Sequence, residues 1–158
     1  MPALLNSNFD RRGFTLVELV VVLAIMAIVA ALAVPRYANS LARYRADAAA
    51  RRIASDIELL QSRAYSRNAT QSAVFSIGSS SYQIEGMADP YHPSQPYTVR
   101  LGESPYFARL KSVNFAGSNT LSFDGYGQPA SAGTIVLAVG MEQRTITIEL
   151  SSGRSRIQ

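Results

Sequence analysis

Apart from Thr15, Glu18 is the only polar residue in the apolar run from Phe14 to Val34. A carboxylate inside a membrane helix is unfavourable by about 2–3 kcal/mol, so it usually has a partner. The run contains no basic residue, and the partner must therefore come from outside it. Proteolysis after Gly13 would create an α-ammonium group on Phe14, within one helical turn of Glu18. If two such helices packed side by side, one Glu18 could neutralise the new terminus of its neighbour.

The element that must position these residues is a membrane helix. Residues 14–34 would extend about 30 Å as a helix, which matches the hydrocarbon core of a bilayer. Pro35 lacks an N–H, so we predict a kink or local opening there, with a helix end at the membrane surface as the alternative. Beyond it, an amphipathic pattern predicts that the helix continues to about Asn68. The predicted apolar stripe is Tyr37, Leu41, Tyr44, Ala48, Ile53, Ile57, Leu60 and Ala64. The predicted i,i+4 ion pairs are Asp47 with Arg51 and Asp56 with Arg52.

From Ala73 onward the period changes from helical to two, which predicts strands. In the last of them, Ile146, Ile148 and Leu150 alternate with polar residues, so one face is expected to be buried. The stripe on the helix needs a surface to cover, and this sheet is the obvious one. The predicted fold is therefore α+β, with a long, partly transmembrane N-terminal helix packed on an antiparallel β-sheet domain. The predicted strands are 73–77, 82–85, 97–101, 110–115, 120–123, 135–139 and 145–150, with a loop at 86–95.

Composition excludes several kinds of chemistry. The chain has no Cys, which excludes disulfides, thiol catalysis and Cys-ligated metals. His92 is the only His, so no second imidazole exists for a metal site or a catalytic dyad. Asp89 and Asp124 belong to no carboxylate-rich run and fit turn or capping roles better than Ca²⁺ ligation. We expect no enzymatic activity, no metal and no cofactor, and a net charge of +4 does not by itself indicate nucleic acid.

The N-terminal residues resemble a known processing signal. Arg11-Arg12-Gly13, then Phe14-Thr15-Leu16-Val17-Glu18 and the apolar run, resemble the class III signal of type IV pilins and type II secretion pseudopilins. The resemblance implies that a prepilin peptidase cuts after Gly13 and methylates Phe14. It also implies that Glu18 is the assembly carboxylate and that Pro35 is where the helix bends or melts in filaments. A secretory signal cut after Ala33 and an uncut signal anchor are the alternatives, which leave Glu18 unexplained.

Two further stretches resemble the H-type (GspH) minor pseudopilins of type II secretion and the related FimT/FimU-like minor pilins. One is the predicted helix end from Asp56 to Asn68, which departs from the family pattern at Tyr65, where an acidic residue is commoner. The other is the C-terminal pattern from Leu121 to Arg154, in which Gly127 matches the loop glycine of the family. The resemblance implies a minor subunit of a type II secretion pseudopilus that assembles through its N-terminal helix. Its implied partners are other pseudopilins or minor pilins and, through the sheet domain, exported cargo.

The tail offers an alternative function. Gly153-Arg154-Ser155-Arg156 resembles the Gly-Arg-x-Arg tail with which FimT-like pilins hold DNA during natural transformation. On an extended segment, Arg154 and Arg156 would point the same way about 6.6 Å apart, roughly two phosphate steps. Two arginines supply only about two phosphate contacts, so binding by one copy would be weak and sensitive to salt. A final strand with solvated arginines is the structural alternative, and it leaves secretion as the favoured function.

These predictions divide the chain into a leader (1–13), a transmembrane and filament-core helix (14–35), its amphipathic continuation (36–69) and a β-rich domain (70–158). Arg11 and Arg12 before the run favour a cytoplasmic N-terminus by the positive-inside rule, although Arg36 follows the run. We therefore expect a single-pass protein of the bacterial inner membrane with a periplasmic C-terminal domain. After processing it would join a periplasmic filament.

Overall fold

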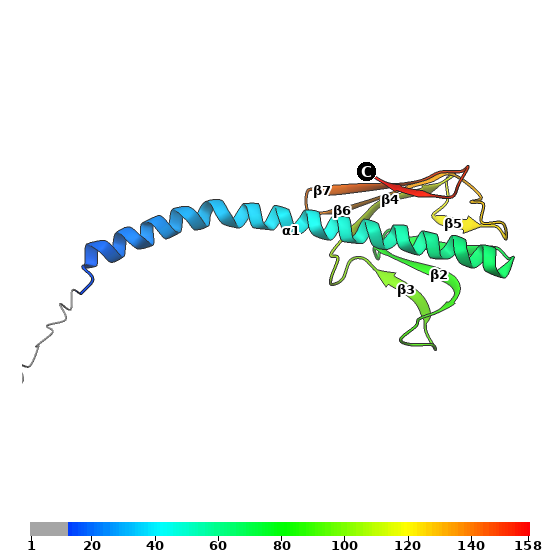
Figure 1. Cartoon of the computed structure of the whole chain (residues 1–158), viewed down its shortest axis with the longest axis horizontal. Helices are drawn as coiled ribbons and strands as arrows, with labels where there is room; N and C mark the ends of the chain where they lie inside the picture. The colour runs from blue at the N-terminus through cyan, green and yellow to red at the C-terminus, as the bar shows by residue number, and fades with distance from the viewer. Residues whose placement is uncertain (1–12) are drawn as a thin grey trace, which may run out of the picture. The chain divides into compact units, whose positions relative to one another are not determined.

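A long helix, α1 (Leu16–Arg67), precedes all the strands in the computed structural model, which describes residues 13–158 (Figure 1). The predicted leader, with Arg11 and Arg12, lies outside the described residues except for Gly13. The chain divides between Ala38 and Asn39 into two compact units. Because α1 includes position 35, the chain does not leave the helix there. The kink at Pro35 stays a prediction.

The C-terminal end of α1 forms a Schellman cap. Asn68 has a positive φ of 49°, a conformation that asparagine tolerates better than most residues. Its N–H donates to Tyr65 O at 3.2 Å, and the N–H of Ala69 donates to Ala64 O at 3.2 Å. These two bonds satisfy carbonyl groups that the end of a helix otherwise leaves unpaired. The predicted helix end near Asn68 is confirmed.

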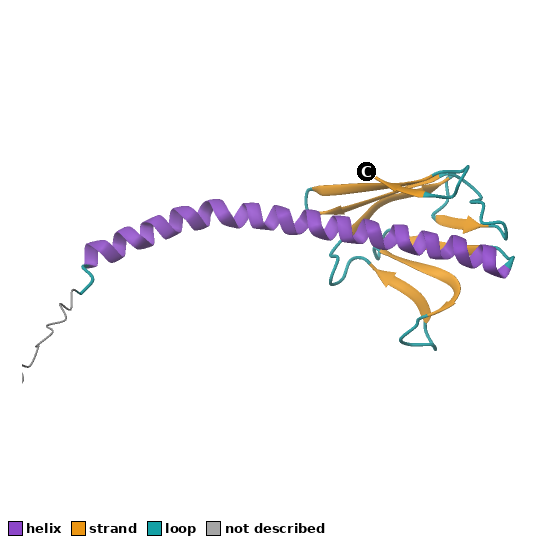
Figure 2. Ribbon diagram, viewed as in Figure 1, coloured by secondary structure: helices purple, strands orange, loops and turns teal. Residues whose placement is uncertain are grey.

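Eight strands form two four-stranded antiparallel sheets within the described residues (Figure 2). The order is β3-β2-β1-β5 in the first sheet and β4-β6-β7-β8 in the second. The chain crosses from one sheet to the other after β3, and β5 returns to pair with β1. The strands are β1 (Gln71–Ser76), β2 (Ser81–Ala88), β3 (Pro96–Arg100), β4 (Arg109–Phe115), β5 (Thr120–Phe123), β6 (Gly133–Val139), β7 (Glu142–Ile148) and β8 (Ser155–Ile157).

One core joins the second half of α1 to both sheets. Phe75 of β1 packs against Tyr82 of β2 and Phe115 of β4, with ring centroids 5.2 and 5.8 Å apart. The helix contributes a buried stripe that begins with three alanines, continues with the larger Ile53, Ile57 and Leu60, and ends with Ala64. These buried residues are Ala46, Ala49, Ala50, Ile53, Ile57, Leu60 and Ala64. The predicted α+β fold, with a long N-terminal helix packed on antiparallel strands, is confirmed.

The first part of the predicted stripe is wrong. Tyr44 is 73% exposed, and so is Tyr37, whereas Ala46, Ala49 and Ala50 are fully buried. Alanine lacks a long side chain, so the backbone of α1 can approach the strands closely at these positions. The apolar period alone favoured the larger tyrosines, but the helix buries the face on which the small residues lie.

Three other predictions differ from the structure. β2 continues to Ala88, with a shift of register against β3, so the predicted loop begins later than residue 86. β7 ends at Ile148, and Leu150 is 54% exposed in the turn that follows. Asp47 forms an ion pair with Arg144 of β7 instead of Arg51 on its own helix. The last difference arises because β7 brings a second guanidinium to the helix, which the sequence spacing cannot reveal.

Candidate functional site

The residues of the predicted processing signal lie where the helix begins. Gly13, Phe14 and Thr15 are non-helical and exposed, and Phe14 is 78% exposed. Thr15 caps the helix, because its Oγ1 accepts a hydrogen bond from the N–H of Glu18 at 3.2 Å. The peptide bond between Gly13 and Phe14 is therefore accessible and is followed directly by an ordered helical turn.

Glu18 belongs to the first turn of α1, where a negative charge is favourable next to the positive end of the helix dipole. The spacing of Thr15 and Glu18 is that of a capping box. In the sequence from Gly13 to Ala38, Arg36 is the only basic residue, about 27 Å farther along the helix. A cation that neutralises Glu18 must therefore come from the chain's own N-terminus or from another molecule.

The first part of α1 presents apolar side chains on every face. It is long and apolar enough to cross a membrane by length and composition, and none of this stretch is buried. Leu19, Leu23, Met26 and Leu32 are among the exposed residues. Such a surface needs lipid or the apolar helices of other subunits around it.

The glycine of the tail has a tertiary role. Gly153 is buried with a positive φ of 67°, and a Cβ there would lie 2.6 Å from Gln61 Nε2 and 2.8 Å from Phe123 Cε1. Gln61 Nε2 also donates hydrogen bonds to Gly127 O at 2.8 Å and to Ser152 O at 3.0 Å. One side chain of the helix thus holds both the loop of Gly127 and the turn before the tail. The glycines singled out by family resemblance are explained by packing against Gln61.

The two tail arginines have different surroundings. Arg154 is exposed just before β8, and its backbone N–H donates to Ser152 Oγ at 3.3 Å. Arg156 lies within β8, and its guanidinium is 3.1 Å from Glu149 Oε1. The side chains of Arg156 and Glu149 are 70% and 42% exposed, so this ion pair is worth at most about 1 kcal/mol. The tail thus ends in a short strand with both arginines at the surface, and DNA binding by these arginines stays a prediction.

A buried polar cluster joins α1 to the first sheet, and sequence reasoning found only half of it. The predicted pair is present, with Arg52 Nε 3.1 Å from Asp56 Oδ2. The carboxylate of Asp56 also accepts hydrogen bonds from the hydroxyl of Tyr82 at 2.6 Å and from that of Tyr97 at 3.0 Å. Arg52 donates in addition to the Tyr97 hydroxyl. The predicted strands 82–85 and 97–101 include both tyrosines, but nothing in the local sequence pattern indicates their contact with Asp56.

Burial and charge perturb the groups of this cluster. Burial and the neighbouring Asp56 carboxylate raise the pKa of Tyr97 to about 12. The same two causes raise the pKa of Tyr82 well above its ordinary value. Burial alone would lower the pKa of Arg52, but Asp56 and the two tyrosines raise it overall. The cluster therefore keeps both phenols protonated beside the Arg52–Asp56 pair, and it ties the helix to the sheet.

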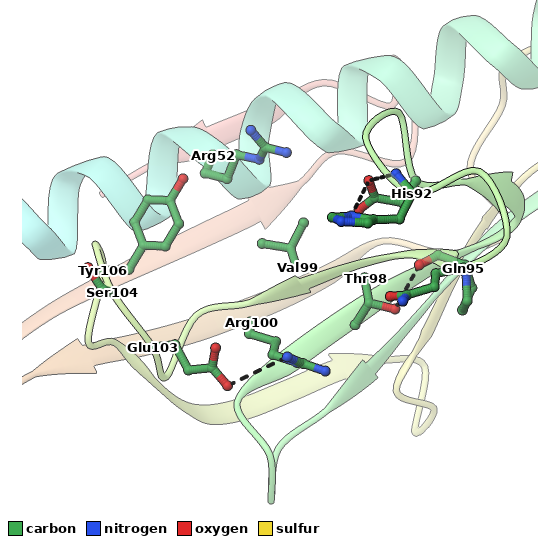
Figure 3. A pocket seen from close by; sticks show the side chains of 11 residues that line it. Arg52, His92, Gln95, Thr98, Val99, Arg100, Glu103, Ser104 and Tyr106 are labelled. Carbon is green, nitrogen blue, oxygen red and sulfur yellow. Dashed lines mark hydrogen bonds and ion pairs between the residues drawn. The ribbon is translucent and has the colours of Figure 1, made fainter.

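A cavity of about 700 Å³ lies beside β3, as Figure 3 shows. Arg52 approaches it from the helix and Arg100 from β3, where Arg100 lies 3.9 Å from Glu103. Asp89 accepts hydrogen bonds from the N–H groups of Tyr91 and His92, which hold the pKa of its carboxyl below the ordinary value. The lining residues are Arg52, Asp89, His92, Gln95, Pro96, Thr98, Val99, Arg100, Glu103, Ser104 and Tyr106.

Each charged group of this cavity has an oppositely charged or hydrogen-bonding neighbour. His92 Nδ1 lies 3.7 Å from Asp89 Oδ1, and its side chain is mostly exposed in the loop before β3. Among residues 13–158, no group of three or more His, Asp or Glu side chains could hold a metal ion.

Asp124, which does not line this cavity, stabilises the loop in which it lies. Its carboxylate accepts hydrogen bonds from the N–H groups of Tyr126 and Gln128.

Comparisons with known proteins agree with this architecture. Residues 8–34 match the family model of the prokaryotic N-terminal methylation motif, and residues 49–153 match that of the type II transport protein GspH. The pilin-like protein PilA1 of Thermus thermophilus is 30% identical over 157 residues, which cover 94% of this chain and 99% of that protein.

Two crystal forms of the type IV minor pilin FimU from Pseudomonas aeruginosa share the fold. The TM-scores are 0.56 at 16% identity and 0.52 at 15% identity. The matches cover 73% and 71% of this chain and 90% and 91% of the FimU chains. The predicted resemblance to GspH-like and minor pilin-like proteins is confirmed.

Proposed function

The chain belongs to the GspH family of pilin-like proteins, and from this premise we propose that it is a minor pseudopilin precursor of a type II secretion pseudopilus. A prepilin peptidase cuts it between Gly13 and Phe14 and methylates Phe14. The processed subunit then assembles with other pilin-like subunits through its N-terminal helix. The single observation that supports this best is an exposed Gly13–Phe14 bond followed by an exposed apolar helix whose first turn carries Glu18.

In the proposed assembly step, Glu18 forms an ion pair with a neighbouring subunit. Processing leaves an ammonium group at Phe14, and an unpaired ammonium is unfavourable among apolar helices. Glu18 of an adjacent subunit neutralises it, and the pairing fixes the axial register of the two helices. Because the apolar surface surrounds the helix on all sides, neighbours can pack in several directions once that register is set.

The proposed topology follows from the same segment. The leader remains in the cytoplasm, the helix crosses the inner membrane, and residues from Asn39 onward fold in the periplasm. The folded unit contacts neighbouring minor subunits or exported cargo and acts as a structural subunit rather than as an enzyme. The charged groups beside the β3 cavity are engaged with one another, which supports a non-catalytic role.

Two measurements test this proposal. Intact-mass analysis of the protein purified from its membrane should give a methylated N-terminus at Phe14. A start at Val34 would indicate an ordinary secretory signal, and a start at Met1 would indicate an uncut anchor. Deletion of the gene should abolish secretion of type II cargo into the medium, with complementation by the wild type and not by the Glu18→Ala variant. Unchanged secretion in the deletion strain contradicts the role in secretion.

A second candidate function is DNA binding for natural transformation, with the chain acting as a FimT-like minor pilin. The exposure of Arg154, together with the solvated and exchangeable pair of Arg156 with Glu149, favours it. Binding of the processed, detergent-solubilised chain to DNA should then weaken steeply as salt is raised. Arg154→Ala and Arg156→Ala should each reduce it, and Arg67→Ala is the control on an exposed arginine of the helix end. Absence of binding at low salt removes this candidate.

A further inference from the structure

One end of the folded unit carries a cluster of arginines and exposed apolar side chains, which we name the proximal pole. It comprises Arg43, Arg45, Phe107, Arg109, Met141 and Arg144, together with the acidic Asp47 and Glu142. The pole is the end of the unit at which the chain arrives from the apolar helix. Asn39, where the unit begins, follows Val34 by five residues, a reach of at most about 18 Å. The short segment from residue 34 to residue 39 therefore keeps this end of the unit close to any bilayer that holds residues 14–34.

Ion pairs attach the β6–β7 turn to the helix at this pole. Arg43 Nε is 2.9 Å from Glu142 Oε1, and Arg144 Nε is 2.6 Å from Asp47 Oδ1. Arg144 also lies 3.7 Å from Glu142 Oε2. The turn between β6 and β7 is thus held beside the part of α1 that contains Arg43 and Asp47 (Figure 1).

The side chains at the pole suit a lipid surface better than water. Met141 is 99% exposed at the tip of the turn, and Phe107 is half exposed in the connection before β4. The guanidinium of Arg45 lies 4.6 Å from the centre of the Phe107 ring. Arg109 is exposed and is paired with Ala138 near the end of β6, so it lies at the same end of the second sheet. Apolar groups flanked by arginines are typical of surfaces that bind at the boundary between headgroups and acyl chains.

Charge favours an anionic surface. The pole has four arginines against Asp47 and Glu142, which leaves an excess of positive charge. Arg100 and Glu103, near the same connection, neutralise each other. Arginines close to an anionic leaflet are attracted to it over about one Debye length, which makes the attraction sensitive to salt.

We propose that the proximal pole is a membrane-contact surface that docks on the anionic lipid headgroups of the bilayer in which the subunit is anchored before assembly. Met141 and Phe107 enter the headgroup boundary, and Arg45 and Arg109 contact lipid phosphates. The inference rests on the proposed membrane anchor but not on whether the filament serves secretion or DNA uptake. Leaving the bilayer for a filament then requires this contact to be released.

The absence of Cys makes a site-specific test direct, since an introduced Cys is the only thiol in the chain. The full processed chain is reconstituted in vesicles of phosphatidylcholine and phosphatidylglycerol in equal parts, which contain a nitroxide-headgroup lipid as quencher. A fluorophore is attached at Met141→Cys, or at Tyr126→Cys as the control. Tyr126 is 79% exposed in a loop that packs near Asn68, about 36 Å along the helix from Arg43.

The label at position 141 should be quenched at least about threefold more strongly than the label at position 126, and salt should reduce the difference. The double substitution Arg45→Gln and Arg109→Gln should lower the ratio of docked to free poles by about fivefold per arginine. The control is Arg67→Gln, which removes a positive charge from an exposed site at the far end of α1 and should leave quenching at 141 unchanged.

Equal quenching at positions 141 and 126 overturns the proposal, and so does quenching at 141 that persists undiminished in pure phosphatidylcholine. Protection of the label at 141 only when other subunits are added would instead assign the pole to a contact between subunits. A third label, at Leu23→Cys, reports on the anchor separately. Loss of its burial in lipid would show that the proposed membrane anchor itself has failed, whereas its retention with no quenching at 141 would refute the docking alone.

Discussion

Both halves of α1 are helical, but the apolar side chains of the first half are exposed, whereas those of the second half are buried. In the first half, Leu19, Leu23 and Leu32 are all more than half exposed. In the second half, Ile53 and Leu60 are fully buried against the sheets. The second half satisfies its apolar stripe within its own chain and leaves polar side chains outside. The first half is apolar on every face, so no single sheet could cover it, and only lipid or other helices can. Thus one element serves both as an anchor and as the support of a folded domain.

The largest effect should follow from substituting the acidic residue in the exposed half. Glu18→Ala leaves the ammonium group of a neighbouring Phe14 without a counter-charge, at about 2–3 kcal/mol or more, so incorporation into filaments should fall at least about tenfold. The control is Glu58→Ala, which removes an exposed carboxylate from the second half and should assemble normally. The quantity to measure is the subunit recovered in sheared or cross-linked filaments. Normal assembly of Glu18→Ala would mean that the two halves do not differ in this way.

The same leucine-to-alanine substitution should separate the two halves by stability. Leu60→Ala removes a fully buried side chain and should lower the free energy of unfolding of the folded unit by about 2–5 kcal/mol. Leu23→Ala removes a side chain that is 57% exposed and should change it by about 0.5 kcal/mol or less. Denaturant unfolding of both variants in detergent, followed by circular dichroism, measures this. Similar losses in the two variants would contradict the division of the helix.

Substitutions at two glycines test how closely the chain packs against the second half of α1. Gly153→Ala places a Cβ within 3 Å of Gln61 and Phe123 at a positive φ, and should destabilise the folded unit by about 2 kcal/mol or more. Gly140→Ala has a similar φ of 58° with nothing within 4 Å, so only backbone strain of about 1 kcal/mol is expected. The difference between their unfolding midpoints isolates the packing against the helix. Equal unfolding midpoints would show that the close packing of Gly153 against Gln61 and Phe123 does not contribute to stability.

The smallest effect concerns the tyrosine cluster at high pH. The pKa of Tyr97 is about 12 in the folded chain, against 10.0 for an unperturbed tyrosine, so the unfolded chain loses this proton first. The stabilisation is therefore complete below pH 10 and is lost as pH rises from 10 to about 12. Tyr97→Phe should flatten this decline, and the exposed Tyr65→Phe is its control. Unfolding of the three proteins at a series of pH values measures it, and identical pH profiles for Tyr97→Phe and the wild type would refute the assignment.

Local patterns in the sequence predicted the elements that depend on near neighbours. The helix end at Asn68, the β1–β2 hairpin and β5 agree with the predicted positions to within a few residues. Gly13 and Phe14 come shortly before α1 and Glu18 lies in its first turn, so their mutual arrangement needed no long-range information. Their roles in cleavage, methylation and assembly stay predictions.

Contacts between distant residues were beyond local patterns. The sequence predicted Asp47 with Arg51, but β7 brings the guanidinium of Arg144 to within 2.6 Å of Asp47. It placed Tyr44 on the buried stripe, but the sheets approach the alanine face of the helix instead. Gln61 gave no sequence signal, although it binds two loops at once. The hydrogen-bonding partner of a polar residue on this helix depends on which strands pack against it, so the local sequence does not predict that partner.

By itself the sequence determined the length of the apolar helix, the acidic residue in its first turn, the glycine before it and the change of period at the first strand. These properties are set by backbone geometry within a few residues of each position. The tertiary structure alone decided that the strands form two sheets and which face of the helix they bury. It also decided which hydroxyl groups donate to Asp56 and which carboxylate pairs with Arg156. Each of these depends on which distant segments meet, and many pairings of the same local elements satisfy the sequence pattern equally well.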